Sequence, residues 1–245
     1  MRIDATFITS AAGATDLPRD GLAEIALVGR SNVGKSSLIN SMVRQRIART
    51  SAGPGKTRLA NLYRVARSGR DPVYFVDLPG YGYARGGDDA ARGFDELAKA
   101  YFAPVRLKAD TTHDQGDERS VRLQPDRAAL LLVDCRHPGL DSDLEAWAWL
   151  RDAVDGAAIV ATKIDKLARG QRIRVMREFE SVFEHPVLPV SAVTGEGLDQ
   201  LWILIDKLTN NNSSSRKPPR SSRPNRLPKA TAARLPRRAL QPPRR

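Results

Sequence analysis

The octapeptide GRSNVGKS at residues 29–36 has the residue types of a phosphate-binding loop. Gly29 and Gly34 let the backbone wrap an anion, so that its amides and the N-terminus of a following helix point at the phosphate. Lys35 can reach the β and γ phosphates, and the Ser36 hydroxyl can ligate magnesium. The segment follows the apolar run EIALV and opens the helical pattern KSSLINSMV, the context that a phosphate loop requires. A glycine turn with a solvated lysine is the less favoured interpretation.

Two further segments could act on the same phosphates and metal. Asp77 begins DLPG at the end of the run VYFV, where its carboxylate can hold magnesium through a water and the Gly80 amide can sense a γ-phosphate. Between the phosphate loop and DLPG, the segment PGKT offers the hydroxyl of Thr57 as another magnesium ligand. Each segment alone is a common turn, so their order along the chain carries the inference. We expect Lys35, Thr57 and Gly80 to be catalytic, and Ser36 and Thr57 to hold the metal.

The segment TKID at residues 162–165 predicts which base is bound. Asp165 can accept hydrogen bonds from guanine N1–H and N2–H₂, which adenine cannot offer, while the stem of Lys163 covers the ring. In SAVTGEGL, the amides of Ser191 and Ala192 could meet guanine O6. GTP and GDP are therefore expected, and an ATP-using phosphotransferase is disfavoured. The full expected binding set is Gly29, Arg30, Ser31, Asn32, Val33, Gly34, Lys35, Ser36, Ser37, Gly55, Lys56, Thr57, Asp77, Leu78, Pro79, Gly80, Thr162, Lys163, Ile164, Asp165, Val190, Ser191 and Ala192.

The elements that must position these residues alternate between strand and helix patterns. The helical patterns are amphipathic, and the strand patterns are short β-rich runs. The strand runs are 24–28, 73–76, 129–133, 157–161 and 186–190, and the later helical patterns are 141–154, 169–183 and 197–208. This alternation predicts a mainly parallel sheet covered on both faces, with ligands beyond the carboxyl ends of its strands. NLYRVA and PVYFVD are separated only by residues 67–71, too few for a crossover helix, so we expect one antiparallel hairpin.

The charge of the 245-residue chain divides it into two parts. The net charge is +12, and residues 210–245 hold eleven Lys or Arg and no Asp or Glu, which leaves 12 − 11 = +1 for residues 1–209. Seven prolines and few large apolar side chains predict a disordered basic tail over residues 210–245. Residues 1–209 are expected to form the folded domain, ending near Leu208, with a polar insertion at 104–124.

Composition also bears on location and partners. The single cysteine, Cys135, excludes an intramolecular disulfide and favours a reducing compartment. No apolar run approaches the roughly 20 residues of a membrane span, and the N-terminus lacks a secretory signal, so a cytoplasmic location without membrane contact is expected. A monomer is also expected. Eleven tail charges favour a polyanion: ribosomal RNA, DNA and anionic lipid fit equally, and a merely solubilising tail is the alternative.

The segments GRSNVGKSSLIN, TSAGPGKT, DLPGYGYA, ATKIDK and SAVTGEGL together resemble the EngB family of bacterial ribosome-biogenesis GTP-binding proteins, with a TrmE-Era-EngA-EngB-type G domain. The resemblance runs from about Phe7 to Leu208 and includes DCRHPGLDSD at 134–143. It implies a three-layer α/β P-loop GTPase that binds GTP or GDP with Mg²⁺. It also implies assistance in maturation of the large ribosomal subunit, and so in cell division, septation and growth, with the subunit precursor or its rRNA as partner.

The sequence departs from the commonest GTPase patterns at several positions. Thr162 stands where many GTPases have the asparagine of an NKxD motif, although TKxD resembles the form found in this family. The loops that an amide ties together elsewhere must here be tied by a hydroxyl. Ala192 and Val193 vary from the commonest form of the last motif, where the backbone does the work. The 104–124 insertion and the tail look like additions to the compact family body.

Two residues bear on the rate of hydrolysis. Tyr81 follows Gly80, where Ras-like GTPases place a water-orienting glutamine, so hydrolysis by the free protein should be slow and wait for a partner. The alternative is that Tyr81 is only a surface aromatic. Asn32 resembles an asparagine that helps hold K⁺ in several GTPases lacking that glutamine, and the alternative is a cap on the loop backbone. A nucleotide-stabilised RNA-binding scaffold with negligible hydrolysis is the alternative function.

Overall fold

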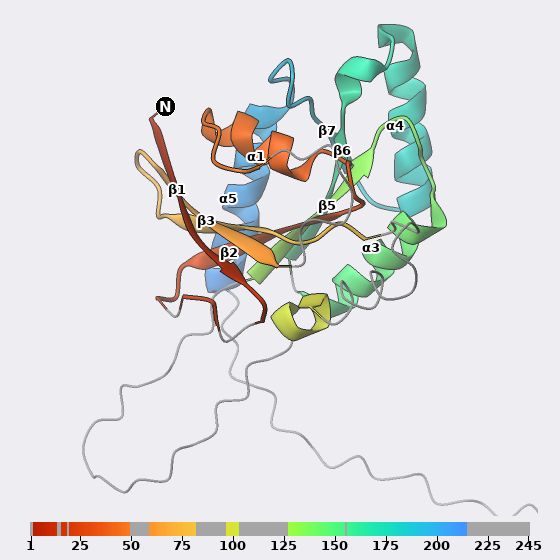
Figure 1. The fold of residues 1–245 in the computed structure, drawn as a ribbon. Helices are drawn as coiled ribbons and strands as arrows, with labels where there is room; N and C mark the ends of the chain where they lie inside the picture. The colour runs from red at the N-terminus through yellow and green to blue at the C-terminus, as the bar shows by residue number, and fades with distance from the viewer. Residues whose placement is uncertain are drawn as a thin grey trace, which may run out of the picture. The chain divides into compact units, whose positions relative to one another are not determined.

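The strands that carry the predicted motifs lie side by side in one sheet (Figure 1). The computed structural model describes residues 2–13, 16–18, 20–49, 59–81, 97–102, 127–154 and 156–214. The strands within these ranges are β1 (Ile3–Ala11), β2 (Ala23–Gly29), β3 (Ala60–Arg67), β4 (Val73–Asp77), β5 (Arg127–Asp134), β6 (Gly156–Thr162) and β7 (Val187–Pro189). The predicted residues Gly55, Lys56 and Thr57, the predicted insertion at 104–124, and residues 215–245 of the predicted tail lie outside the described ranges.

The sheet has the order β1-β3-β4-β2-β5-β6-β7. β2 pairs in parallel with β4 and β5, β6 continues the parallel set, and β7 ends it. β3 and β4 form the predicted antiparallel hairpin. The expectation of a mainly parallel α/β sheet with one hairpin is therefore confirmed, and the carboxyl end of β2 lies between those of its two parallel neighbours.

Helices cover both faces of the sheet, which gives three layers (Figure 1). The helices are α1 (Lys35–Val43), α3 (Asp141–Ala153), α4 (Arg169–Phe183) and α5 (Leu198–Ser214), with a further helical segment at 97–102 and a 3₁₀ turn, η3 (Ile164–Lys166). One core lies under α1 and α5, and the other lies under α3, α4 and the 97–102 segment. Because both faces are covered, the central strands are continuous apolar runs, which is why the sequence revealed them.

Alternation along β2 shows how one strand serves both cores. Ile25 and Leu27 belong to the core under α1 and α5, whereas Ala26 and Val28 belong to the opposite core. Successive side chains of a strand point to opposite faces, so both sets are withdrawn from water. Each fully buried Leu or Ile contributes roughly 1.5–3 kcal/mol relative to exposure, which fixes the register of the strand that leads into the phosphate loop.

The edge strand β1 was not predicted. It pairs antiparallel with β3, and the pairing shifts register between Phe7 and Thr9. Its sequence, IDATFITSA, mixes polar and apolar residues, and most of its side chains are exposed or only half buried. Backbone hydrogen bonds to β3, which join residues far apart in sequence, hold this strand. The hydrophobic pattern therefore carries little signal for it.

The C-terminal helix α5 continues to Ser214, past the expected end of the folded domain near Leu208 and through residues 210–214, which composition assigned to the tail. The amphipathic pattern ends near Leu208 because the next residues, TNNNSS, are polar. Adding residues to a helix that is already anchored costs little, since nucleation is the expensive step. The Thr209 hydroxyl also donates to the Ile205 carbonyl at 3.1 Å. No helix in the described part of the chain is long and apolar enough to cross a membrane.

Shortening the chain tests where the folded domain ends. A chain ending at Ser214 keeps every described residue, so its free energy of unfolding should match that of the full chain within about 0.5 kcal/mol. A chain ending at Leu208 loses the last turns of α5 and the Thr209 hydrogen bond, and should lose on the order of 1 kcal/mol. Urea unfolding measures both. Equal stability of the two shortened chains would show that residues 209–214 add nothing.

Candidate nucleotide-binding site

The predicted phosphate loop connects β2 to α1 at the carboxyl edge of the sheet. Gly34 caps α1 with a φ of 113°, a backbone conformation that favours glycine. Gly29 is required for a different reason: a Cβ there would lie 2.7 Å from the Leu132 carbonyl oxygen of β5. The two glycines therefore serve a left-handed turn and a close strand-to-strand approach, as a loop that wraps an anion needs.

Lys35 lies at the start of α1 and is only 8% exposed. Its Nζ donates to the carbonyl oxygens of Gly29 at 2.9 Å and of Arg30 at 3.4 Å. Burial lowers the pKa of Lys35, and the nearby carboxylate of Asp77 partly opposes that shift. The ammonium is thus held inside the loop, at the position from which it can meet a phosphate.

Ser36 and Asp77 meet at the same end of the loop. The Ser36 hydroxyl donates to Asp77 Oδ2 at 3.0 Å. Parallel pairing brings this about, because Asp77 is in register with Leu27, two residues before Gly29. Burial raises the pKa of Asp77, while Lys35 and the Ser36 hydrogen bond act in the opposite direction. A hydroxyl beside a carboxylate supplies the hard oxygen ligands that Mg²⁺ prefers, so these residues fit the predicted metal.

The DLPG segment packs directly on the phosphate loop. A Cβ on Gly80 would lie 2.6 Å from both the amide nitrogen and the hydroxyl oxygen of Ser31, so only glycine fits. The Ser31 amide donates to the Tyr81 carbonyl at 3.3 Å, and the Leu78 amide donates to the Leu27 carbonyl at 3.3 Å. Backbone contacts therefore hold residues 78–81 at the loop.

Tyr81 is buried, so its interpretation as a surface aromatic is wrong. Its hydroxyl donates to Asp143 Oδ1 at 2.8 Å, and the Arg30 guanidinium lies 3.2 Å from the same oxygen. Burial raises the pKa of Tyr81, and the negative charge of Asp143 raises it further. A three-residue cluster thus joins the phosphate loop, DLPG and α3.

Asp143 was not predicted as a member of the site. It is 1% exposed, and burial raises its pKa, against the lowering by the Tyr81 hydrogen bond and the Arg30 charge. In the sequence it is one of two acids in the first turn of a helix, which the helix dipole explains without any contact to Tyr81. The resemblance over residues 134–143 was the one signal that included it.

Thr162 ties the guanine motif to the phosphate loop. Its buried hydroxyl lies 2.7 Å from the carbonyl oxygen of Val33 and 3.0 Å from that of Val133. One hydroxyl hydrogen is thus shared between carbonyls of two different segments. The expectation that a hydroxyl here would tie the loops together agrees with this geometry.

Lys163 adds a second tie to the phosphate loop. Its Nζ donates to the Asn32 carbonyl at 2.7 Å and to Asp134 Oδ2 at 2.8 Å. Burial alone would raise the pKa of Asp134, but hydrogen bonds from Arg136 and Lys163 outweigh it and lower that pKa. The exposed side chain of Asn32 forms no hydrogen bond with the residues that the structure describes, so the alternative of a backbone cap is not seen among them.

The base-recognition segments meet at Asp165 and Ser191. The Ser191 hydroxyl donates to Asp165 Oδ1 at 2.7 Å, which lowers the pKa of Asp165 and keeps it ionised. The Ser191 amide, however, donates to the Glu196 carbonyl at 2.9 Å, so it would have to exchange this partner to meet guanine O6 as predicted. The Ala192 amide donates to no group in the described part of the chain and is left for that role. Ser191 acts instead through its hydroxyl, which orients the carboxylate.

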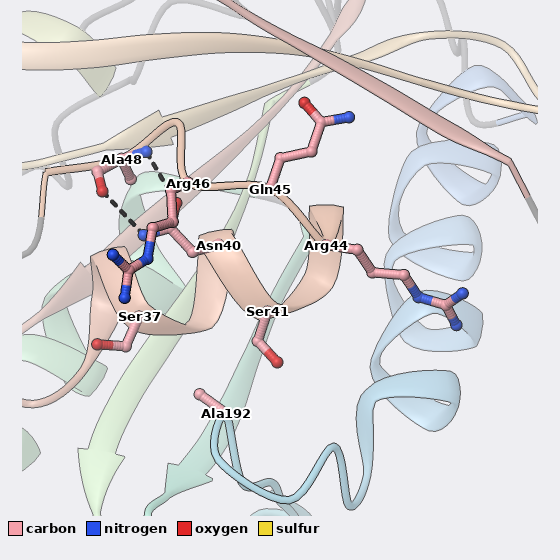
Figure 2. Close-up of a pocket in the computed structure, with 8 residues that line it drawn as sticks. All are labelled: Ser37, Asn40, Ser41, Arg44, Gln45, Arg46, Ala48 and Ala192. Atoms are coloured by element: carbon pink, nitrogen blue, oxygen red, sulfur yellow. Dashed lines mark hydrogen bonds between the residues drawn. The ribbon is translucent and has the colours of Figure 1, made fainter.

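A polar groove of about 600 Å³ lies beside α1, and Figure 2 shows its lining. Ser37 at the phosphate end and Ala192 at the base end both contribute to it, so segments far apart in sequence border one space. Asn40 holds the far wall: its Oδ1 accepts from the amides of Ile47 and Ala48, and its Nδ2 donates to the Ala48 carbonyl at 2.8 Å. This clamp fixes the segment that precedes the one carrying Thr57.

Removing the Thr162 hydroxyl tests the tie between the two loops. Thr162→Val keeps the side-chain shape but leaves the buried carbonyls of Val33 and Val133 without this donor, so stability should fall by about 1–3 kcal/mol. Affinity for GDP and GTP should fall together, because the tie holds the loop rather than the γ-phosphate. Thr162→Ser keeps the hydroxyl and is the matched control. Urea unfolding measures the stability of both variants, and calorimetry measures their nucleotide affinity. If Thr162→Val behaved like the parent in both, the Thr162 hydroxyl would not hold the phosphate loop.

Tyr81→Phe tests the buried cluster. Loss of the hydroxyl donor raises the pKa of Asp143 further, so burying the ionised carboxylate becomes costlier, by about 1–3 kcal/mol at neutral pH. A raised native pKa destabilises the fold as pH rises through it, so the deficit should shrink as pH falls through the pKa of Asp143. Urea unfolding at two pH values measures this. As a control, Tyr74→Phe removes a similar hydrogen bond to the exposed Asp20 and should cost less. If the loss of stability in Tyr81→Phe did not depend on pH, the role assigned to Asp143 would be contradicted.

Comparison with known proteins agrees with this geometry. A family model described as "50S ribosome-binding GTPase" matches residues 24–163. A probable GTP-binding protein EngB from Heliobacterium modesticaldum is 37% identical over 212 residues, covering 84% of this chain and 93% of the relative. The corresponding protein from Chlorobaculum tepidum is 39% identical over 208 residues, covering 84% and 97%.

Solved structures share the fold. A probable EngB structure aligns over 77% of this chain and 99% of its own, with a TM-score of 0.55 and 22% identity. Era in complex with MgGDPNP and nucleotides 1506–1542 of 16S ribosomal RNA aligns over 77% of this chain and 57% of its own, with a TM-score of 0.60 and 22% identity. The fold is that of a P-loop GTPase, and the relatives match most of this chain at 37–39% identity. This chain therefore belongs to the EngB family of GTP-binding proteins and is a GTPase.

Proposed function

We propose that this GTPase acts as a slowly hydrolysing switch in the cytoplasm, as a monomer that assists assembly of the large ribosomal subunit. The observation that carries the nucleotide part is the pair of ties from Thr162 and Lys163 to the phosphate loop, because they bring the guanine-reading and phosphate-binding segments into one site. Asp165 sits three residues after Thr162, with its carboxylate oriented by Ser191. This arrangement supports GTP or GDP as ligand.

Magnesium is the metal that the site fits best. Ser36 and Thr57 would hold it directly, and Asp77 would hold it through a water. Bound there, Mg²⁺ neutralises charge that develops on the phosphates. Lys35 would place its ammonium on the β and γ phosphates, and the Gly80 amide would face the γ-phosphate. The 3.0 Å contact between Ser36 and Asp77 supports this assignment.

Slow hydrolysis follows from what stands beside Gly80. The Tyr81 hydroxyl donates to Asp143 in a buried cluster and carries no amide that could orient water. A partner that completes the site would then be needed for fast turnover. Asn32, whose side chain is exposed at the loop, is the residue we assign to a K⁺ ion that would supply part of the missing charge.

The ribosomal part of the proposal rests on charge and on relatives. Residues 210–245 carry eleven cationic and no anionic side chains, and releasing counterions from phosphates favours RNA binding by such a segment. The matching family model is described as ribosome-binding, and the Era structure contains ribosomal RNA. A ribosomal particle is the partner that joins these observations.

Sedimentation of cell extract tests the proposal. With a nonhydrolysable GTP analogue, the protein should sediment with large-subunit particles, and with GDP it should stay largely in the supernatant. Lys35→Ala, which removes the cation proposed for the phosphates, should abolish the difference between the nucleotides. Equal particle binding with either nucleotide would favour the RNA-binding scaffold with negligible hydrolysis.

The chain ending at Ser214 examines the tail in the same assay. It keeps every described nucleotide-binding residue, so GTP affinity should be unchanged. Particle affinity should fall, and the dependence of log K on log salt should flatten by about 0.7–0.9 for each phosphate that the tail no longer neutralises. Unchanged affinity and slope would mean that the tail does not bind the particle.

A further inference from the structure

Helix α4 and the turn before it carry an exposed cluster of cations. Residues 166–177 contain five basic side chains and no acidic one. Residues 1–209 have a net charge of only +1, as counted above, so this cluster is a local excess. Four of its members are exposed and are called here the α4 basic face: Lys166, Arg169, Arg174 and Arg177.

Within the described part of the chain, most of these charges have no acidic partner. Arg172, the fifth basic residue, forms a two-pronged ion pair with Glu196, in which Nη1 lies 2.9 Å from both carboxylate oxygens. Lys166 lies 3.6 Å from Asp165. Arg169, Arg174 and Arg177, in contrast, form no salt bridge with any residue that the structure describes. These three arginines are therefore exposed, and no described acidic side chain compensates their charge by a close contact.

Helix stability does not explain this arrangement. A helix favours acidic side chains at its N-terminus and basic ones at its C-terminus, each worth roughly 0.3–1 kcal/mol. α4 has the reverse order, since its first turn has no acid and its last turn has no base. Glu178, Glu180 and Glu184 follow the arginines instead. The charge order thus works against the fold, which points to a role outside it.

The α4 basic face is fixed relative to the nucleotide site. Val175, Phe179 and Phe183 anchor the opposite side of α4 in the core. The Arg172–Glu196 pair connects the start of α4 to the loop of Ser191, whose hydroxyl orients Asp165. In Figure 1, α4 lies beside β7 at the edge of the sheet, which is consistent with their contact. A partner on this face would be held in a defined position with respect to the bound nucleotide.

We propose that the α4 basic face contacts RNA phosphates. This inference rests on the proposed ribosomal function, and it gives the folded domain an RNA-binding surface of its own besides the basic tail. Arg174 and Arg177 are three residues apart, so they lie side by side on the helix. Arginine matches phosphate with a fork of donors. An anionic membrane fits less well, because a membrane-surface helix needs a free apolar face, and that of α4 is buried in the core. Among these arginines one large apolar side chain, that of Ile173, is exposed, at 64%.

The test uses the full chain with a nonhydrolysable GTP analogue and purified large ribosomal subunits. Arg174→Gln with Arg177→Gln should weaken binding on the order of tenfold and flatten the salt dependence of log K by about 1.4 for single-stranded contacts. The control is Arg64→Gln with Arg151→Gln, two exposed arginines on β3 and α3 that remove the same total charge. The control should match the parent in affinity and slope. Calorimetry with the GTP analogue should give the same affinity for all three proteins.

The outcomes separate this proposal from the function on which it rests. If the parent chain itself does not bind the particles, the ribosomal function fails. If the parent binds and both double variants behave like it, the α4 basic face is refuted while the ribosomal function stands. Equal weakening by the two double variants would show only an effect of net charge, and would also refute the proposal. A membrane role would refute it as well. In that case the α4 variant would bind the particles like the parent but would no longer bind phosphatidylglycerol vesicles, which the parent would bind.

Discussion

The loop between β2 and α1 depends on hydrogen bonds to two other segments, residues 162–163 and Tyr81. Its carbonyl oxygens at Asn32 and Val33 accept from Lys163 and Thr162, and its Ser31 amide donates to Tyr81. Leaving the buried Val33 carbonyl unpaired would cost free energy, so the Thr162 hydroxyl helps to fix the shape of the loop before any ligand binds. The guanine-recognition segment and the phosphate loop are thus joined by one set of hydrogen bonds, so a substitution in one segment should alter the geometry of the other.

Burial makes the charges in this site costly. It lowers the pKa of Lys35 and raises those of Asp77 and Asp143, so in each case the charged form is disfavoured. Neighbouring opposite charges and hydroxyls recover part of that cost. Phosphates and a magnesium ion would bring the complementary charges to Lys35 and Asp77. Asp143 instead depends on Arg30 and Tyr81, which makes it a structural support for the DLPG segment.

Much of the fold could be predicted because its central strands are covered on both faces. β2, β4, β5 and β6 show as apolar runs, and α1, α3 and α4 begin and end close to their predicted bounds. The elements that were missed or misjudged lack such a pattern. β1 is an exposed edge strand held by pairing with β3, and the last turns of α5 are polar. Local sequence carries little information where a neighbour's backbone, or an existing helix, supplies the stability.

The sequence by itself determined the chemistry: a lysine, hydroxyls and carboxylates at fixed spacing predicted a guanine nucleotide with magnesium, and the same segments indicated the family. Only the tertiary structure decided how these groups support one another. It placed the Tyr81 hydroxyl on Asp143, the Ser191 hydroxyl on Asp165 and the Ser191 amide on Glu196. It also put Arg169, Arg174 and Arg177 of α4, which form no salt bridge with a described residue, on the exposed side of that helix. Spacing along a chain specifies which groups are available, whereas hydrogen-bond partners and burial depend on packing between segments that the sequence separates by tens of residues.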